Sequence, residues 1–123
     1  MALAFDKWLN VEADQAKHLH YDKEHVLSTV GEDVDLLRQV LRLTRDELLD
    51  SEQDLDLAFK EQDLSHLVAV GHKLYGISIT SGLKQLAFLA NELAQIGEFE
   101  VDKVEGMINK IRKEIKTCLE LIS

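Results

Sequence analysis

Residues 71–82 read Gly-His-Lys-Leu-Tyr-Gly-Ile-Ser-Ile-Thr-Ser-Gly, and they place a histidine inside a segment that is otherwise typical of a helix. Gly76 follows His72 by one helical turn. A glycine inside a helix costs about 0.5–1 kcal/mol relative to alanine, so we expect something to compensate for it. Our hypothesis is that Gly76 leaves open space beside the imidazole of His72, through which a large group can reach the ring.

The composition around this stretch indicates an all-α protein. The chain has 123 residues, a size typical of one domain, and it contains no proline. Strong helix formers dominate, and no long stretch alternates between apolar and polar residues as a half-buried strand would. We expect a less regular arm or short helix at 1–20 and a single helical domain at 21–123.

The charge and the cysteine content argue against several classes of protein. Acidic residues outnumber basic ones by 23 to 14, for a formal net charge of −9, whereas nucleic-acid-binding proteins concentrate lysine and arginine on one face. No apolar run approaches the roughly 20 residues of a membrane span, and no signal-peptide pattern opens the chain. The single cysteine fits a reducing compartment. We therefore expect a cytoplasmic protein that binds neither nucleic acid nor membranes.

Local signals delimit the first two helices of the domain. Asp22 is placed to cap a short helix that runs to about residue 30, and Gly31 is placed to end it. A long helix is expected at 32–62, because apolar or small residues recur there in steps of three and four, as in a bundle seam. The seam residues are Val34, Leu37, Leu41, Thr44, Leu48, Ser51, Leu55 and Ala58. We expect the 22–30 helix to cover the further apolar residues that widen this stripe, which are Leu36, Val40, Leu43 and Leu49.

The next helix carries His72. Asp63 is placed to cap a helix at 64–80. The core face of this helix is predicted to hold Leu64, Leu67, Val68, Gly71, Leu74, Tyr75 and Ser78. His72 lies beside this face, and most of its neighbours on that flank are small, namely Ser65, Val68, Ala69, Gly76 and Ile79. We therefore expect His72 to be partly exposed, with room above the ring.

Two more helices complete the predicted bundle. Ser81 and Gly82 form a corner, a helix with a broad apolar face follows at 83–96, and Gly97 ends it. The seam of the last helix is Val101, Val104, Ile108, Ile111, Ile115, Cys118 and Ile122. Cys118 holds a core position, so we interpret it as a small buried hydrophobe and not as a reactive thiol. Together the helices predict an antiparallel up-down-up-down four-helix bundle, with a short N-terminal helix or helices packed on one end.

Most catalytic and metal-binding chemistries lack their residues in this chain. Without strands there is no Gly-rich phosphate loop of the strand-to-helix type, and nothing suggests the oxyanion hole of a hydrolase. His18 and His20 do not share a helical face, so we interpret them as surface residues. Asp63 and His66 have an i, i+3 spacing similar to that of di-iron bundles, but Asp63 lies at a helix start, where it acts as a cap. We expect no metal and no cofactor.

His72 is the remaining candidate for chemistry. An imidazole is a competent nucleophile at cellular pH, and it can accept a phosphoryl group when a partner supplies the metal ion and the charge stabilisation. The run from His72 to Gly76 is followed by five residues, then by Gly82, and then by Leu83 and Leu86. This arrangement resembles the motif of histidine-containing phosphotransfer (HPt) domains, in which His-x-Leu-Lys-Gly precedes a second glycine and a leucine-rich helix.

The resemblance covers about residues 21–120 and implies a function. HPt domains carry a phosphoryl group on the matching histidine, here His72, and exchange it with an aspartate of a receiver domain, which brings Mg²⁺ and most of the catalytic groups. They bind no ATP and are carriers, not enzymes. Gly76 matches the glycine that admits the receiver, and Ala69 lies one turn before the histidine. The implied partners are response-regulator receiver domains and a hybrid histidine kinase. A receiver is expected to dock on the 64–80 helix and its neighbours, through Val68, Ser65, Ile79 and Val26.

Two positions depart from the family pattern. Tyr75 stands where members usually have a lysine three residues after the histidine. Lys73 is adjacent to the histidine in the sequence but points about 100° away on the helix, so Lys84, one corner further on, is expected to reach the phosphoryl group instead. Ala94 stands where many members have an acidic or amide side chain that orients the imidazole, with Gln95 next to it. These departures leave open a second interpretation, a helical bundle that docks receivers with reduced or no phosphotransfer.

Two further interpretations concern His72 itself. A sensor-kinase dimerisation domain also uses a helical histidine, but Lys73 stands where such domains have an acid, and the chain lacks their proline. A buried, hydrogen-bonded His72 would have a purely structural role. We also expect a monomer, because the apolar seams of these helices are just enough to pack against one another in a single bundle.

Overall fold

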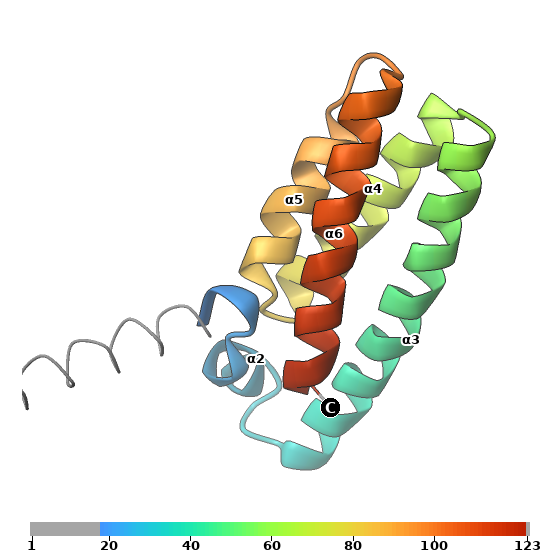
Figure 1. Ribbon diagram of the computed structural model, residues 1–123. Helices are drawn as coiled ribbons and strands as arrows, with labels where there is room; N and C mark the ends of the chain where they lie inside the picture. The colour runs from blue at the N-terminus through green and yellow to red at the C-terminus, as the bar shows by residue number, and fades with distance from the viewer. Residues whose placement is uncertain (1–17, 123) are drawn as a thin grey trace, which may run out of the picture.

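The computed structural model describes residues 18–122, and all its elements in that range are helices (Figure 1). They are α2 (Lys23–Thr29), α3 (Val34–Lys60), α4 (Leu64–Thr80), α5 (Lys84–Ala94) and α6 (Val101–Ile122). Residues 18–20 are also helical, but the rest of the predicted arm at 1–20 lies outside the described residues. Within 18–122, no helix combines the length and the apolar character needed to cross a membrane.

Helices α3 to α6 form the predicted antiparallel bundle. Each of the four packs against its two neighbours in a closed ring, in the order α3, α4, α5, α6 (Figure 1). The short helix α2 lies at the end of the bundle where α4 turns into α5. The backbone amide of Asp22 donates a hydrogen bond to the carbonyl of Gly82 there, at 2.9 Å. The predicted fold class, including a short helix on one end, is confirmed.

Aspartate caps begin three of these helices. Asp22, Asp33 and Asp63 each accept a hydrogen bond from the backbone amide three residues later, at distances of 3.2, 3.1 and 3.0 Å. Such caps satisfy an amide that the first turn of a helix leaves unpaired. Gly31 follows α2 with a φ of +68°, which glycine adopts without steric cost. The predicted roles of Asp22, Asp63 and Gly31 are therefore confirmed.

In α3 and α6 the core lies where the seams place it, with two exceptions at helix starts. The buried apolar residues include Leu37, Leu48, Leu55, Leu67, Leu74, Leu86, Leu93, Ile108, Ile111, Ile115 and Ile122. Val34 and Val101 were predicted in seams but are 51% and 44% exposed, and each is the first residue of its helix. Cys118 is fully buried as predicted, and burial raises the pKa of its thiol.

The second apolar stripe of α3 is not covered as predicted. Leu36, Leu43 and Leu49 are 41%, 66% and 41% exposed, so the expectation that the 22–30 helix covers this flank was wrong for them. The reason is the shortness of α2, which has seven residues. Its buried residue, Val26, packs against Gly82 at the α4–α5 corner and not along α3.

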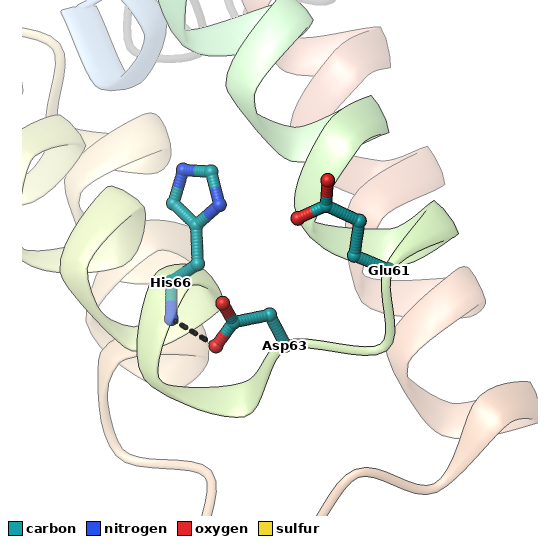
Figure 2. Close-up of side chains that lie close together, drawn as sticks. All are labelled: Glu61, Asp63 and His66. Carbon is teal, nitrogen blue, oxygen red and sulfur yellow. Dashed lines mark hydrogen bonds between the residues drawn. The ribbon is translucent and has the colours of Figure 1, made fainter.

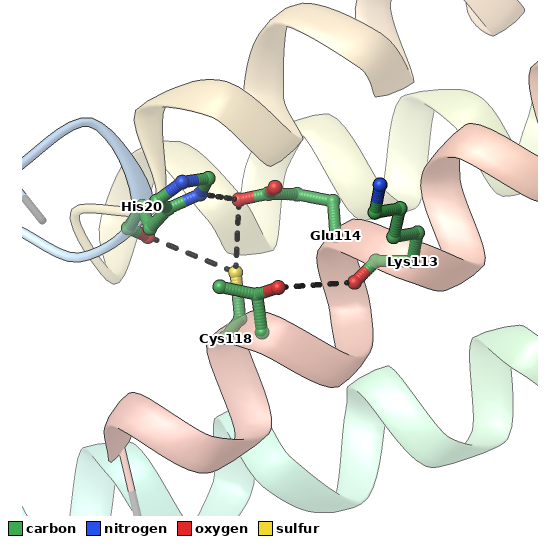
Figure 3. A network of polar contacts seen from close by, with 5 residues as sticks. His20, Lys113, Glu114 and Cys118 are labelled. Carbon is green, nitrogen blue, oxygen red and sulfur yellow. Dashed lines mark hydrogen bonds and ion pairs between the residues drawn. The ribbon is translucent and has the colours of Figure 1, made fainter. Parts of the chain in front are cut away.

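A polar cluster joins the segment before α2 to α6 (Figure 3). Glu114 is only 6% exposed, and its carboxylate lies within hydrogen-bond distance of Nδ1 of His20. The thiol of Cys118 donates to the same carboxylate at 3.6 Å and to the backbone carbonyl of His20 at 3.7 Å. The side chain of His20 is 33% exposed, as expected for a surface histidine, but its Nδ1 also contacts a buried carboxylate 94 positions away, which the sequence did not indicate.

Candidate functional site

His72 lies in the middle of α4 with its side chain exposed. The buried residues of α4 are Leu67, Val70, Gly71, Leu74 and Ser78. The core face is thus turned toward Val70 and away from Tyr75, which was predicted to be in the core but is 41% exposed. Burial on the side of Leu74 and Val70 leaves His72 facing solvent. The prediction of an exposed imidazole is confirmed, and a buried structural histidine is excluded.

Gly76 and Gly71 lie on the same helix but in opposite surroundings. A methyl group added at Gly76 would meet no heavy atom within 4 Å, and the residue is exposed. A methyl group added at Gly71 would lie 2.7 Å from the backbone nitrogen of Ala94 and 3.0 Å from the carbonyl oxygen of Ala90. Gly71 therefore lets α4 and α5 pack closely, whereas packing does not explain Gly76. The alanines of the 83–96 segment, Ala87, Ala90 and Ala94, are the sequence signal for this close approach.

Two lysines considered for the phosphoryl group are both in ion pairs. Nζ of Lys73 lies 3.0 Å from Oε2 of Glu47 on α3. Nζ of Lys84 lies 3.2 Å from Oδ2 of Asp22, at the end of the bundle that holds α2. Since α4 continues for eight residues after His72, this end is about 12 Å further along the helix axis. Lys73 is the lysine that α4 itself places next to the histidine.

The expected docking residues fall into two groups. Ser65, Ala69 and Ile79 are exposed on α4, Ile79 by 51%, and Val68 is half-buried. Val26 is 1% exposed, so a docking role for it was wrong. Its side chain fills the space beside Gly82, which has no β-carbon and so leaves room for it.

The position expected to orient the imidazole offers no polar side chain. Ala94 is buried and contacts the backbone of Gly71, the residue before His72. Gln95 is exposed, and its Nε2 donates a hydrogen bond to Oδ1 of Asn91 at 3.2 Å. The backbone of Ala94 thus lies where α5 packs closely on α4.

A separate group of possible metal ligands lies at the α3–α4 turn (Figure 2). One ligand atom each from Glu61, Asp63 and His66 lies within 4.8 Å of the others. The carboxylate of Asp63 already accepts the capping hydrogen bond from the backbone of His66, and Glu61 and Asp63 are both exposed. Capping thus explains how Asp63 and His66 come together without an ion.

Sequence reasoning missed the partner of Lys73. Glu47 belongs to no motif, and it lies 26 positions away from Lys73 in the sequence. No local spacing indicates a contact over such a separation. Only the packing of α3 against α4 brings the two side chains together.

Comparisons with known proteins give one informative match. No protein-family model matches the chain, and no curated protein does. Among solved structures, the chain is similar to the HPT domain of an Hpt sensor hybrid histidine kinase from Shewanella, with a TM-score of 0.72 and 18% sequence identity. The match covers 85% of this chain and 92% of that one. The protein therefore has the fold of a histidine-containing phosphotransfer domain.

Proposed function

We propose that this protein is a phosphorelay intermediate that carries a phosphoryl group on His72 between the aspartates of receiver domains. The observation that carries the proposal is the open space at Gly76, one turn from an exposed His72. A helical glycine at an exposed site costs about 0.5–1 kcal/mol, and here no close packing offsets it. Clearance for an incoming protein surface accounts for a glycine at this position.

The reaction that fits this site is a direct transfer. The phosphorus–oxygen bond of an aspartyl phosphate breaks while a phosphorus–nitrogen bond forms to a ring nitrogen of His72. The aspartate leaves as a carboxylate, and the imidazole gives up one proton. Phosphoryl transfer depends mainly on positioning and charge stabilisation, which the receiver supplies with its Mg²⁺. The part of α4 is to hold an accessible nucleophile, so the protein acts as a carrier.

The exposed side of α4 supports docking of a receiver. Tyr75 and Ile79 are 41% and 51% exposed and lie within two turns of His72 on the same helix. Exposed apolar and aromatic side chains around a reactive group are typical of protein–protein contact surfaces. We propose that Val68, Ser65 and Ile79 contribute to this surface, together with Tyr75.

The test is transfer of a radioactive phosphoryl group from a phosphorylated receiver. We expect label on the protein that is labile in acid and stable in base. His72→Gln should take up no label, whereas His66→Gln, six residues earlier on the same helix, should be labelled like the wild type. Label that persists in His72→Gln would refute the assignment. Gly76→Leu should slow the transfer without loss of helicity, and an unchanged rate would contradict the access argument.

The alternative function, receiver docking without transfer, has its own outcome in this experiment. It is favoured by Tyr75, an uncharged residue where the family pattern has a lysine. Tight binding of a receiver that transfers to a known HPt domain, with no label on this protein, would establish it.

A further inference from the structure

The positive charge next to His72, on Lys73, is paired with a carboxylate of α3. Lys73 follows His72 directly and is paired with Glu47, and the two side chains are 44% and 43% exposed. The pairing with Glu47 raises the pKa of Lys73, and the negative charges of Asp54 and Asp50 add to this effect. Lys73 of α4 thus contacts one carboxylate of α3, the helix on which α4 packs, and two further aspartates of α3 add to the negative charge around it.

We propose that the Lys73–Glu47 ion pair is a charge-exchange element for His72: Lys73 leaves Glu47 to pair with the phosphoryl group once the histidine carries one. The inference rests on the proposed function, because it needs a phosphoryl group at His72. Tyr75 offers no positive charge at the position where the family pattern has one. Lys84 is engaged by Asp22 at the end of the bundle.

The geometry permits the exchange. Consecutive residues of a helix point about 100° apart, and the four-carbon stem of lysine is long and flexible enough to cover that angle. Both side chains of the pair are more than two fifths exposed, which keeps the pair weak, but Oε2 of Glu47, the atom that Lys73 contacts, is itself buried. The phosphoryl group must therefore offset the loss of this contact when Lys73 leaves. A phosphoryl group carries about 1.5 to 2 negative charges near pH 7, against one for a carboxylate, so it attracts the ammonium group more strongly.

The exchange also affects how readily the phosphoryl group is given away. When Lys73 moves, Glu47 remains as an unpaired negative charge on the same helix as Asp50 and Asp54. Like charges repel, so these carboxylates of α3 disfavour the phosphorylated state while Lys73 favours it. These residues therefore set the balance between holding and transferring the group.

The test uses no receiver. Phosphoramidate phosphorylates the protein directly: its phosphorus–nitrogen bond breaks, ammonia leaves, and a phosphorus–nitrogen bond to the imidazole forms as the ring loses a proton. The ³¹P chemical shift of the phosphohistidine is then followed from pH 6 to 9 to give the second ionisation constant of the phosphoryl group. A neighbouring ammonium group increases this constant because it favours the dianion.

Three variants give distinct expectations. In Lys73→Gln the ionisation constant should fall about two- to fivefold, the range that a partly exposed charge pair supplies. In Glu47→Gln it should rise, and the rise should be smaller when Lys73→Gln is also present, because no lysine is then released. Lys84→Gln removes an equal charge from an ion pair of similar length, and it should leave the constant unchanged.

Each contrary result has a definite meaning. If the second ionisation constant of the phosphoryl group is the same in Lys73→Gln and in the wild type, the charge-exchange inference is overturned. The proposed function survives that result as long as His72 is phosphorylated. A response to Lys84→Gln in place of Lys73→Gln also overturns it. If transfer from receivers fails but the ionisation constant responds to Lys73→Gln, the proposed function fails alone. A chain that phosphoramidate does not label at His72 overturns both.

Discussion

Replacing Gly71 and Gly76 with alanine, one at a time, should change the stability of the protein in opposite directions. Both glycines lie inside α4, so each substitution brings the same gain in helix propensity. A methyl group at Gly76 would contact nothing within 4 Å. At Gly71 it would lie 2.7 Å from the nitrogen and 3.0 Å from the α-carbon of Ala94, and these are backbone atoms that cannot rotate away. Accommodation there requires α4 and α5 to move apart.

The magnitudes follow from these contacts. Gly76→Ala should raise the free energy of unfolding by about 0.5–1 kcal/mol, mainly because alanine has less backbone freedom to lose on folding. Gly71→Ala makes the same gain but overpacks a helix interface, which costs about 1–3 kcal/mol, for a net loss of about 0.5–2 kcal/mol. The two variants should therefore differ by about 1–3 kcal/mol.

Urea denaturation followed by circular dichroism at 222 nm measures both free energies directly. Each variant serves as the control for the other, since the substitution and the helix are the same. A Gly71→Ala variant as stable as Gly76→Ala would refute the close packing of α4 on α5. A destabilised Gly76→Ala variant would show that this glycine has a packing role, and it would remove the main support for the access argument.

Three further predictions concern the α2 end and the core. Gly82→Ala should lower the free energy of unfolding, measured in urea, by about 2 kcal/mol or more. Gly82 has a φ of +67°, and the new methyl group would lie 2.8 Å from the carbonyl oxygen of Asp22 and from the side chain of Val26. An unchanged free energy would contradict this packing. The hydrogen bond from the backbone amide of His25 lowers the pKa of Asp22 in the folded protein. The carboxylate therefore stabilises the fold at pH values above the ordinary aspartate pKa of about 3.9. This stabilisation is lost as the pH falls through the lower pKa that Asp22 has in the folded state. The difference in unfolding free energy between the wild type and Asp22→Asn, measured at a series of pH values, should shrink below about pH 4, and a constant difference would argue against the cap. Cys118 should react with a thiol reagent on the order of 100-fold slower or more in the native protein than in urea, because burial raises the pKa of its thiol and shields it; equal rates would place it at the surface.

The sequence was sufficient to predict the fold class and the position of the candidate nucleophile. Seams with steps of three and four define which face of each helix is apolar, and Asp22, Asp63 and Gly31 define where helices begin and end. These signals act between residues a few positions apart, so they can be read locally. The same periodicity places His72 beside the core face of α4, which is why its exposure could be predicted.

The same periodicity fails where a helix has little to pack against. It assigned Val34 and Val101 to the core, although each is the first residue of a helix. It also led to the expectation that α2 covers the second stripe of α3, although Leu43 is 66% exposed. An apolar stripe indicates which side of a helix favours burial, but not how far the neighbouring helices extend.

Only the tertiary structure placed Gly71 against the backbone of α5, buried Val26 beside Gly82, and brought Glu47 to Lys73 and Glu114 to His20. The partners in these contacts are between 19 and 94 positions apart in the sequence, counting from Gly71 to Ala90 and from His20 to Glu114. Their proximity depends on which helices are neighbours, on how closely the helix axes approach and on how each helix is rotated. A local pattern determines the conformation of a segment and its apolar face. The distances between segments are set by the packing of all the helices together.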